Sequence, residues 1–395
     1  MNTQGIHAPV ELAYHFSDIP SKWPPMPKRL LFPVVLAAGL AAMPAAHAGL
    51  FGRGAPAPIA VDAATPATAL QGAWKSTGQR VTTPPGNVLI SNFRVVVLTN
   101  VAGSGSVTPG FANPDGGSAS ISAFYTLNGL DKAALQAMTD KAYAQLQADL
   151  GAAGYTVLPR ATLQGVKGVE HLDGDGSLER VQFISAQNGA SSGYMFTPSD
   201  MPVKLPMGGR KLEEGKPTSD ANSKSIGRLF SAAASASGAG RSQFVATEVA
   251  GRVGATLLDV TYTVTFAEFK GSGFSNSAGN TATLSSKVTP IIVPTDTSIQ
   301  VYRPKMGNNG TIELQKPLIA QGQAFADLRE TTTRGDKAGA VTGAVLSGLL
   351  ALGGGGGMSV HQTKRYEVDA TPDHALVLGS ALAAANRSIP AAIAQ

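Results

Sequence analysis

Four oxygen-bearing side chains are spaced as in a calcium-binding loop: Asp173, Asp175, Ser177 and Glu179. They occupy the first, third, fifth and seventh positions, from which such a loop presents oxygens to the ion. The sixth position, where the loop needs glycine, is Leu178, and the twelfth, where a bidentate carboxylate belongs, is Ile184. The sequence therefore favours a solvated turn in a hairpin over residues 163–187, with calcium binding as the alternative.

Three histidines follow the amino-terminal leader and are the remaining candidates for a metal ligand or a general base: His171, His361 and His374. No two of them stand at the spacing of a zinc-protease motif. The chain has no cysteine, which excludes disulfides, thiolate nucleophiles and a lipid-bearing cysteine after a signal peptide. The sequence thus predicts no catalytic residue, no metal site and no cofactor, and it favours a protein that is not an enzyme.

Small residues recur every four positions near the carboxyl end, at Gly335, Gly339, Gly343 and Ser347. On a helix they share one face, which allows a second helix to approach closely. Five consecutive glycines at 353–357 disfavour helix and leave about fifteen good positions, or about 22 Å, which is short for a membrane span. We expect a glycine-zipper helix within 331–358 that packs on a copy of itself or contacts a membrane through 338–352. A buried glycine-rich helix or a loop is the alternative.

The clearest structural element is a helix followed by a strand at 241–271. Apolar residues recur at helical spacing until Gly254, where a left-handed residue ends the helix. Apolar residues from Leu258 to Phe266 then alternate with Asp259 and three threonines. This alternation predicts a strand that is buried on one face and wetted on the other.

The other predicted elements alternate between strands and helices. They are strands at 93–99, 119–127, 155–158, 288–293, 298–303, 311–314 and 361–369, and helices at 131–150 and 373–386. The run at 93–99 is typical of a central strand covered on both faces. The predicted fold class is α/β (or α+β), a mixed sheet with helices packed on it, plus the carboxyl-terminal glycine-zipper segment.

Composition and the amino terminus point to export. Lys28 and Arg29 precede an apolar run that ends at Ala46-His47-Ala48, the pattern of a cleaved secretory signal. The predicted organisation is a leader at 1–48 with the signal proper at 26–48, a linker at 49–88, an α/β domain at 89–330 with a polar insert at 188–240, the zipper segment at 331–358 and a strand and helix at 359–395. Only 14% of residues are charged and the net charge is +5, with Lys and Arg scattered, so nucleic-acid binding is not expected.

The order of elements resembles a known family of envelope proteins. FRVVVLTNV, the 131–150 helix, GYTVLPR and EVAGRVGATLLDVTYTVTF are similar in type to the amino-terminal α/β domain of the curli-secretion lipoproteins (CsgG-like) and TolB-like envelope proteins. The resemblance covers about residues 90–330 and implies a non-enzymatic role in the envelope. Two features depart from the family: the lipid-bearing cysteine is missing, and the insert at 188–240 has no counterpart.

Together these features predict an exported envelope protein, in the periplasm or at the outer membrane, that binds or assembles rather than catalyses. Its expected partners are copies of itself or another envelope protein. The alternative is a secreted hydrolase whose site gathers residues distant in sequence, such as the three histidines with carboxylates. A soluble periplasmic binding module is a third hypothesis.

Overall fold

The computed structural model describes a large part of the chain in separate stretches. These are residues 56–78, 84–107, 119–172, 180–185, 189–204, 210–211, 243–276, 279–294, 296–304, 309–333 and 360–394.

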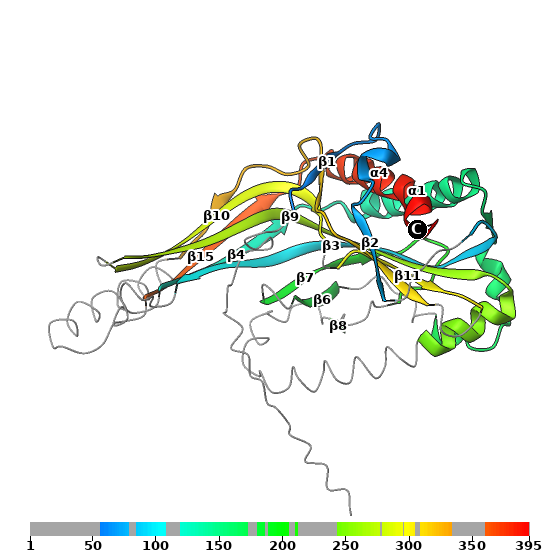
Figure 1. Ribbon diagram of the computed structural model, residues 1–395. Coiled ribbons are helices and arrows are strands. Elements are labelled where there is room, and N and C mark those ends of the chain that lie inside the picture. Colours follow the sequence, from blue (N-terminus) through cyan, green and yellow to red (C-terminus); the bar gives the residue numbers. More distant parts are fainter. Residues whose placement is uncertain are drawn as a thin grey trace, which may run out of the picture. The chain divides into compact units, whose positions relative to one another are not determined.

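The described residues form a mixed α/β fold built on a 15-stranded sheet, which confirms the predicted fold class (Figure 1). The strands are β1 Ile59–Val61, β2 Trp74–Gly78, β3 Asn87–Val107, β4 Ala119–Asn128, β5 Thr156–Val157, β6 Arg180–Ser185, β7 Gly189–Phe196, β8 Arg210–Lys211, β9 Thr256–Asn276, β10 Gly279–Ile292, β11 Ser298–Tyr302, β12 Gly310–Leu314, β13 Leu318–Ala320, β14 Arg329–Glu330 and β15 Val360–Asp369. The main path runs β1-β13-β10-β9-β3-β4-β15-β14, and the other strands branch from it.

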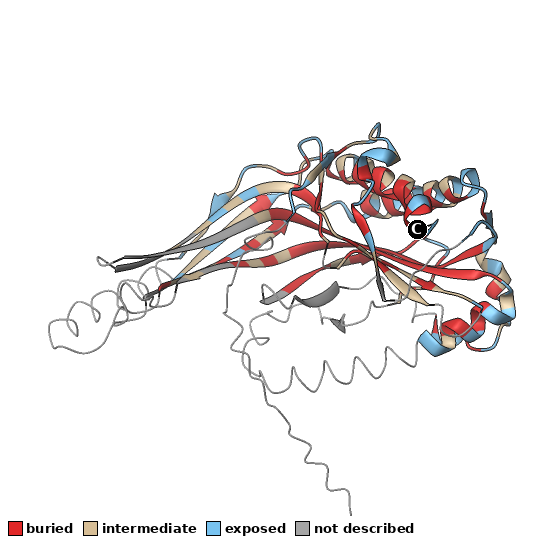
Figure 2. Ribbon diagram, in the orientation of Figure 1, coloured by how far each residue is buried: buried red, intermediate tan, exposed pale blue. Residues whose placement is uncertain are grey.

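Two long parallel strands, β3 and β9, form the centre of the sheet. Val88 pairs with Thr256 and Val97 with Val264, with one irregularity in register between Ile90 and Asn92. Both strands are buried throughout this paired region (Figure 2). Runs of β-branched residues suit such a position because they pack well on a pleated surface that is covered on both sides.

The prediction that β9 is wetted on one face is wrong. Thr263 and Thr265 are as buried as the apolar residues between them, and Asp259 and Thr261 are buried as well. Segment 197–204 covers part of this second face, because the Lys204 carbonyl accepts a hydrogen bond from the Arg94 side chain. Burial of Thr263 is offset by a local hydrogen bond, since Thr263 Oγ1 donates to the Asp296 carbonyl at 2.9 Å, whereas Thr265 Oγ1 has no hydrogen-bond partner among the described residues.

Helices cover both faces of the central strands. Helices α1 (Lys132–Ala152) and α4 (His374–Ala394) lie together on one face (Figure 1). The helical segment 243–253 packs on the other face, where its buried residues join Leu89, Leu163 and Leu257 in a second apolar cluster. The two faces therefore have separate cores around one shared sheet.

The backbone confirms the predicted ends of the 131–150 helix to within two residues and the predicted end of the central helix at Gly254, but α4 runs to Ala394, eight residues beyond the predicted end at Asn386. Asp131 caps α1 by accepting hydrogen bonds from the Ala133 and Ala134 amides. Gly154 and Gly254 both have positive φ, at 90° and 66°; Gly154 follows Ala153, the carboxyl-terminal cap of α1, and Gly254 directly follows the 243–253 helix. Glycine suits these positions because a left-handed residue after a helix lets the next amide reach back to the last turn.

Three boundary predictions need correction. Residues 56–78 are not a tether: β1 pairs with β13 and β2 with β12, and Trp74 is buried against α4. Residues 163–172 are not a hairpin arm, because they follow a 3₁₀ turn at Arg160–Leu163 and contain another at Val169–His171. The first part of the predicted insert, β7, belongs to the sheet and pairs with both β3 and β6.

Asn386 ties the helical layer to the sheet. Its side chain is fully buried, accepts a hydrogen bond from the Tyr262 hydroxyl at 2.7 Å and donates to the Ala142 carbonyl at 2.7 Å. Burial raises the pKa of Tyr262 well above its usual range, so this hydroxyl is a donor at all ordinary pH values. One amide thus connects α4, β9 and α1.

We expect Asn386→Leu to lower the free energy of unfolding by about 1–3 kcal/mol, because the Tyr262 hydroxyl then has no partner in the core. Urea denaturation measures the effect. Tyr262→Phe should cost much less when it is added to Asn386→Leu than when it is made alone. Full additivity of the two changes would show that the hydrogen bond contributes nothing.

Candidate functional site

The two sites nominated by motif spacing lie outside the described residues. This holds for Asp173, Asp175, Ser177 and Glu179, and for Gly335, Gly339, Gly343 and Ser347. Calcium binding and glycine-zipper packing therefore stay predictions. Among the residues that are described, no group of three or more His, Cys, Asp or Glu side chains is arranged to hold a metal ion.

The three histidines occupy different settings. His374 is buried at the start of α4, where its Nδ1 lies 2.6 Å from the Thr371 carbonyl oxygen. His171 is exposed, with Nε2 at 3.9 Å from the carboxylate of its neighbour Glu170. His361 lies on β15, paired with Ser120 of β4, and its side chain is not described. Among the described residues, neither His171 nor His374 forms an ion pair with a carboxylate from a distant part of the chain, as the hydrolase alternative requires.

Residues 189–193 read Gly-Ala-Ser-Ser-Gly, a spacing shared with the nucleophile elbow of α/β hydrolases that the motif analysis missed. An elbow needs a sharp turn between a strand and a helix, with the serine exposed at its apex. Here the five residues lie in the extended strand β7, and Ser191 and Ser192 are buried. Ser192 Oγ accepts a hydrogen bond from the Asn100 side chain at 3.1 Å. The motif is thus part of the sheet interior.

A buried polar cluster lies on the second face of the central strands. Arg94 forms an ion pair with Asp259, and its Nε and Nη2 donate to Thr261 Oγ1 at 3.1 and 3.0 Å. Asn92 donates to the other oxygen of Asp259 at 3.3 Å. Asn92 and Arg94 lie on β3, and their partners Asp259 and Thr261 lie on the neighbouring strand β9. The cluster is satisfied from within the protein, and we interpret it as a structural connection between β3 and β9.

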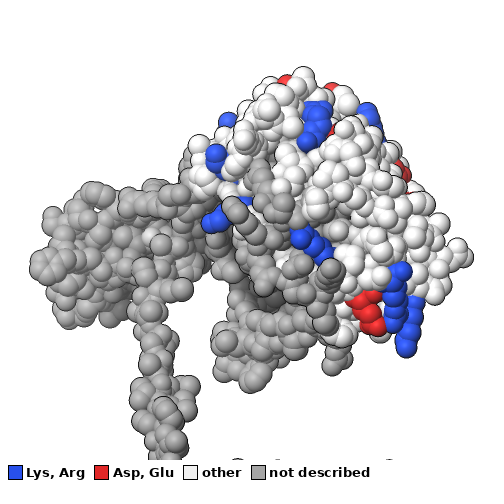
Figure 3. Space-filling view, turned by 45° about the vertical axis from the view of Figure 1, so that its right-hand side comes forward, with Lys and Arg blue, Asp and Glu red and all other residues white. Residues whose placement is uncertain are grey.

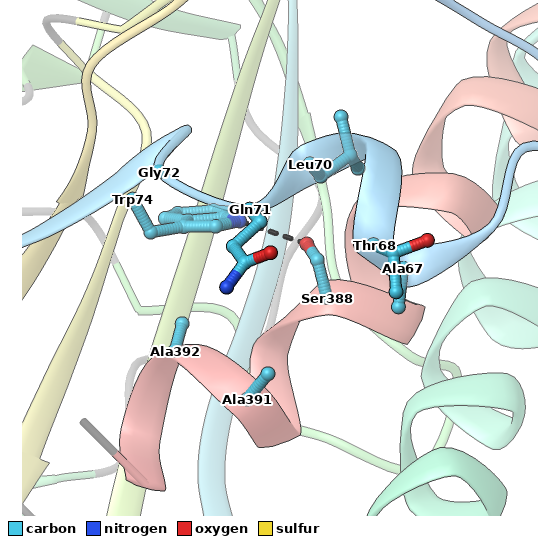
Figure 4. A pocket seen from close by; sticks show the side chains of 9 residues that line it. All are labelled: Ala67, Thr68, Leu70, Gln71, Gly72, Trp74, Ser388, Ala391 and Ala392. Atoms are coloured by element: carbon cyan, nitrogen blue, oxygen red, sulfur yellow. Dashed lines mark hydrogen bonds between the residues drawn. The ribbon is translucent and has the colours of Figure 1, made fainter.

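A small pocket lies where the amino-terminal elements meet the end of α4 (Figure 4). Its volume is about 200 Å³; Thr68 and Gln71 line one side, and Ala391 and Ala392 of α4 line the other. The Trp74 indole N–H donates to Ser388 Oγ at 2.8 Å, and that hydroxyl donates to the Ala385 carbonyl at 2.6 Å. The pocket is smaller than most ligand sites, and its contacts serve mainly to dock β2 on α4.

Helix α4 is long and apolar enough to cross a membrane by length and composition, and within the described part of the chain it is alone in this. More than half of its apolar window is buried inside the protein, 56%, and its buried side chains pack on the sheet and on α1. Here α4 is a core helix. On the face shown in Figure 3, Lys and Arg side chains are spread over a largely uncharged surface.

Several long strands have an edge without a partner among the described strands. The strands β9 and β10 pair from Val288 and Ala267 out to Gly279 and Asn276, and over 279–288 β10 is hydrogen-bonded to no second strand among those described. The same holds for β3 over 101–107, where it pairs with β4 alone. These segments belong to two long hairpins that extend away from the helices (Figure 1).

No family model, curated protein or solved structure matches this chain. The resemblance to curli-secretion lipoproteins stays a prediction based on its quoted residues. A function must therefore be inferred from the described residues. Two of their features are used below, namely the unpaired strand edges and the surface between α1 and α4.

Proposed function

We propose that this chain is an exported envelope protein that assembles with copies of itself and has no catalytic role. The observation that carries the proposal is the pair of long hairpins, β3–β4 and β9–β10, with unpaired edges among the described strands. Residues 265–276 of β9 alone extend about 40 Å at about 3.3 Å per residue. Natural proteins usually shorten, cover or charge such edges, because an open edge pairs with other chains.

The composition of the β9–β10 hairpin supports the same function. Its outer part, 271–283, carries no charged side chain and is rich in Ser, Gly, Thr and Asn. The charges that would protect an edge are therefore missing over these residues. Pairing with an edge of another copy would satisfy the backbone amides and carbonyls along its length.

Shortening the hairpin tests this proposal. Gly271 pairs with Leu284, so joining these two residues through Asn-Gly removes 272–283 and keeps every core contact of the hairpin base. We expect the parent, lacking residues 1–48, to be oligomeric by sedimentation and native mass measurement. The shortened chain should be monomeric, because the edge that pairs between copies is gone.

A matched control changes the turn and leaves the edges in place. Replacing Ser277-Ala278 by Asn-Gly keeps the length of β9 and β10, so this variant should remain oligomeric. A parent chain that stays monomeric at its solubility limit, with and without detergent, would refute assembly. An oligomer that survives the shortening would place the contact elsewhere.

A further inference from the structure

An apolar groove of about 420 Å³ runs between α1 and α4 on the side away from the sheet. Its walls are mostly alanine, including Ala134 and Ala137 of α1 and Ala383 of α4. The two helices come close on its floor: a Cβ on Gly379 would lie 3.2 Å from Met138 Cγ. The groove exists because small side chains line it while larger ones point into the core.

One large apolar side chain stands at this groove without cover. Leu376 is 71% exposed, the highest value for any large hydrophobic residue in the described part of the chain. Isolated exposed leucines are common on protein surfaces. An exposed leucine beside an alanine-walled groove of this size instead extends an apolar surface that a ligand can cover.

The lining of the groove contains one charged side chain. Lys141 is the only ionisable group in its lining, and no carboxylate among the described residues pairs with this ammonium group. The other polar groups are Gln145, whose Nε2 donates to Asp149 at 2.8 Å, and Ser380, whose hydroxyl donates to the Val377 carbonyl at 2.7 Å. The groove thus offers a long apolar surface with one cation and no anion.

We propose that this groove binds a free long-chain carboxylate, with the alkyl chain on the alanine walls and the acid group at Lys141. Charge complementarity selects an anionic head, and the apolar walls select an unbranched chain over a polar molecule. The volume lies within the range of about 300–1,000 Å³ in which proteins hold small molecules. This site is separate from the strand edges and does not depend on self-assembly.

Calorimetric titration of the chain lacking residues 1–48 tests the proposal with octanoate, decanoate and dodecanoate, each below its micellar concentration. We expect affinity to rise about fourfold for each methylene buried, until the groove is full. Lys141→Gln should weaken dodecanoate binding about tenfold and leave dodecanol binding unchanged. Lys287→Gln, which removes an exposed cation on β10, should change neither.

A blocking variant gives a second, independent measurement. Ala137 is exposed on α1, so Ala137→Phe fills the groove without entering the core and should abolish binding of both dodecanoate and dodecanol. Circular dichroism confirms that this variant folds. The hairpin-shortened chain should bind dodecanoate as the parent does, which separates this proposal from self-assembly.

Three results would overturn the assignment. Binding to phosphatidylglycerol vesicles without binding of monomeric dodecanoate would identify a membrane headgroup as the ligand. Equal weakening by Lys141→Gln and Lys287→Gln would show unspecific attraction to a basic protein. Undiminished binding by Ala137→Phe would place the ligand outside the groove.

Discussion

Replacing Asp259 by alanine is expected to lower the free energy of unfolding by about 3–5 kcal/mol, the largest effect of any charge removal we predict. The Arg94 side chain is only 5% exposed and that of Asp259 11%, so water cannot replace the lost carboxylate. The remaining partners of Arg94 are neutral, namely the Thr261 hydroxyl and the Lys204 carbonyl. A buried guanidinium without a counter-charge is therefore left between β3 and β9.

Urea denaturation of a small set of variants separates the ion pair from its surroundings. Arg94→Met combined with Asp259→Leu should cost less than Asp259→Ala alone, because the double change leaves no unpaired charge. Glu367→Ala, which breaks the exposed pair between Arg329 and Glu367, should have little effect since solvent screens that pair. If Asp259→Ala and the double variant lower the free energy of unfolding equally, the loss of stability is not caused by a buried unpaired charge.

Local signals in the sequence predicted the helix of the central element and the start of its strand, but β9 runs to Asn276, beyond the predicted end of the element at 271. The helix at 243–253, Gly254 and the long strand β9 follow from periodicity and from the conformational freedom of glycine. Helix α1 follows from its apolar stripe, and the structure adds that Asp131 caps it. In each case the determining interactions lie within a few residues along the chain.

The misassigned segments depend on partners that are distant in sequence. Residues 56–78 are rich in alanine and threonine, and they join the core through strand pairing with β13 and β12 and through the bond from Trp74 to Ser388. Strand β7 is similar: Ser191, Ser192 and Gly193 read as a loop until they lie against β3. A Cβ on Gly193 would collide with the Val97 carbonyl, so the apparent loop residue is required by close strand packing.

The groove between α1 and α4 could not be read from the sequence. Its walls come from segments more than 200 residues apart, and alanine on a helix signals only good helix propensity. Lys141 looks like an ordinary solvated residue on the polar side of α1. Only the packing of α4 beside α1 turns these residues into one apolar surface with a single charge.

The second large effect is expected for Thr263→Asp, which should cost more than about 4 kcal/mol at neutral pH. Thr263 is fully buried and donates its hydroxyl proton to the Asp296 carbonyl. A carboxylate cannot donate, so the new negative charge would face a carbonyl oxygen. Burial would raise the pKa of the introduced carboxyl above its unfolded value. The loss should therefore be largest at neutral pH and shrink as the pH falls below that raised pKa.

Two further variants decide whether β9 is buried on both faces. Thr263→Val keeps the shape and removes only the hydrogen bond, so it should cost about 1 kcal/mol. Val260→Asp places the same charge on the opposite face, beside α1 and α4, and should be as damaging as Thr263→Asp. If Thr263→Asp proves far milder than Val260→Asp in urea titrations, the second face is open to water. The one-sided strand inferred from the alternating sequence would then be right, and the cover that Asp296 and Thr297 give to Thr263 would contribute little to stability.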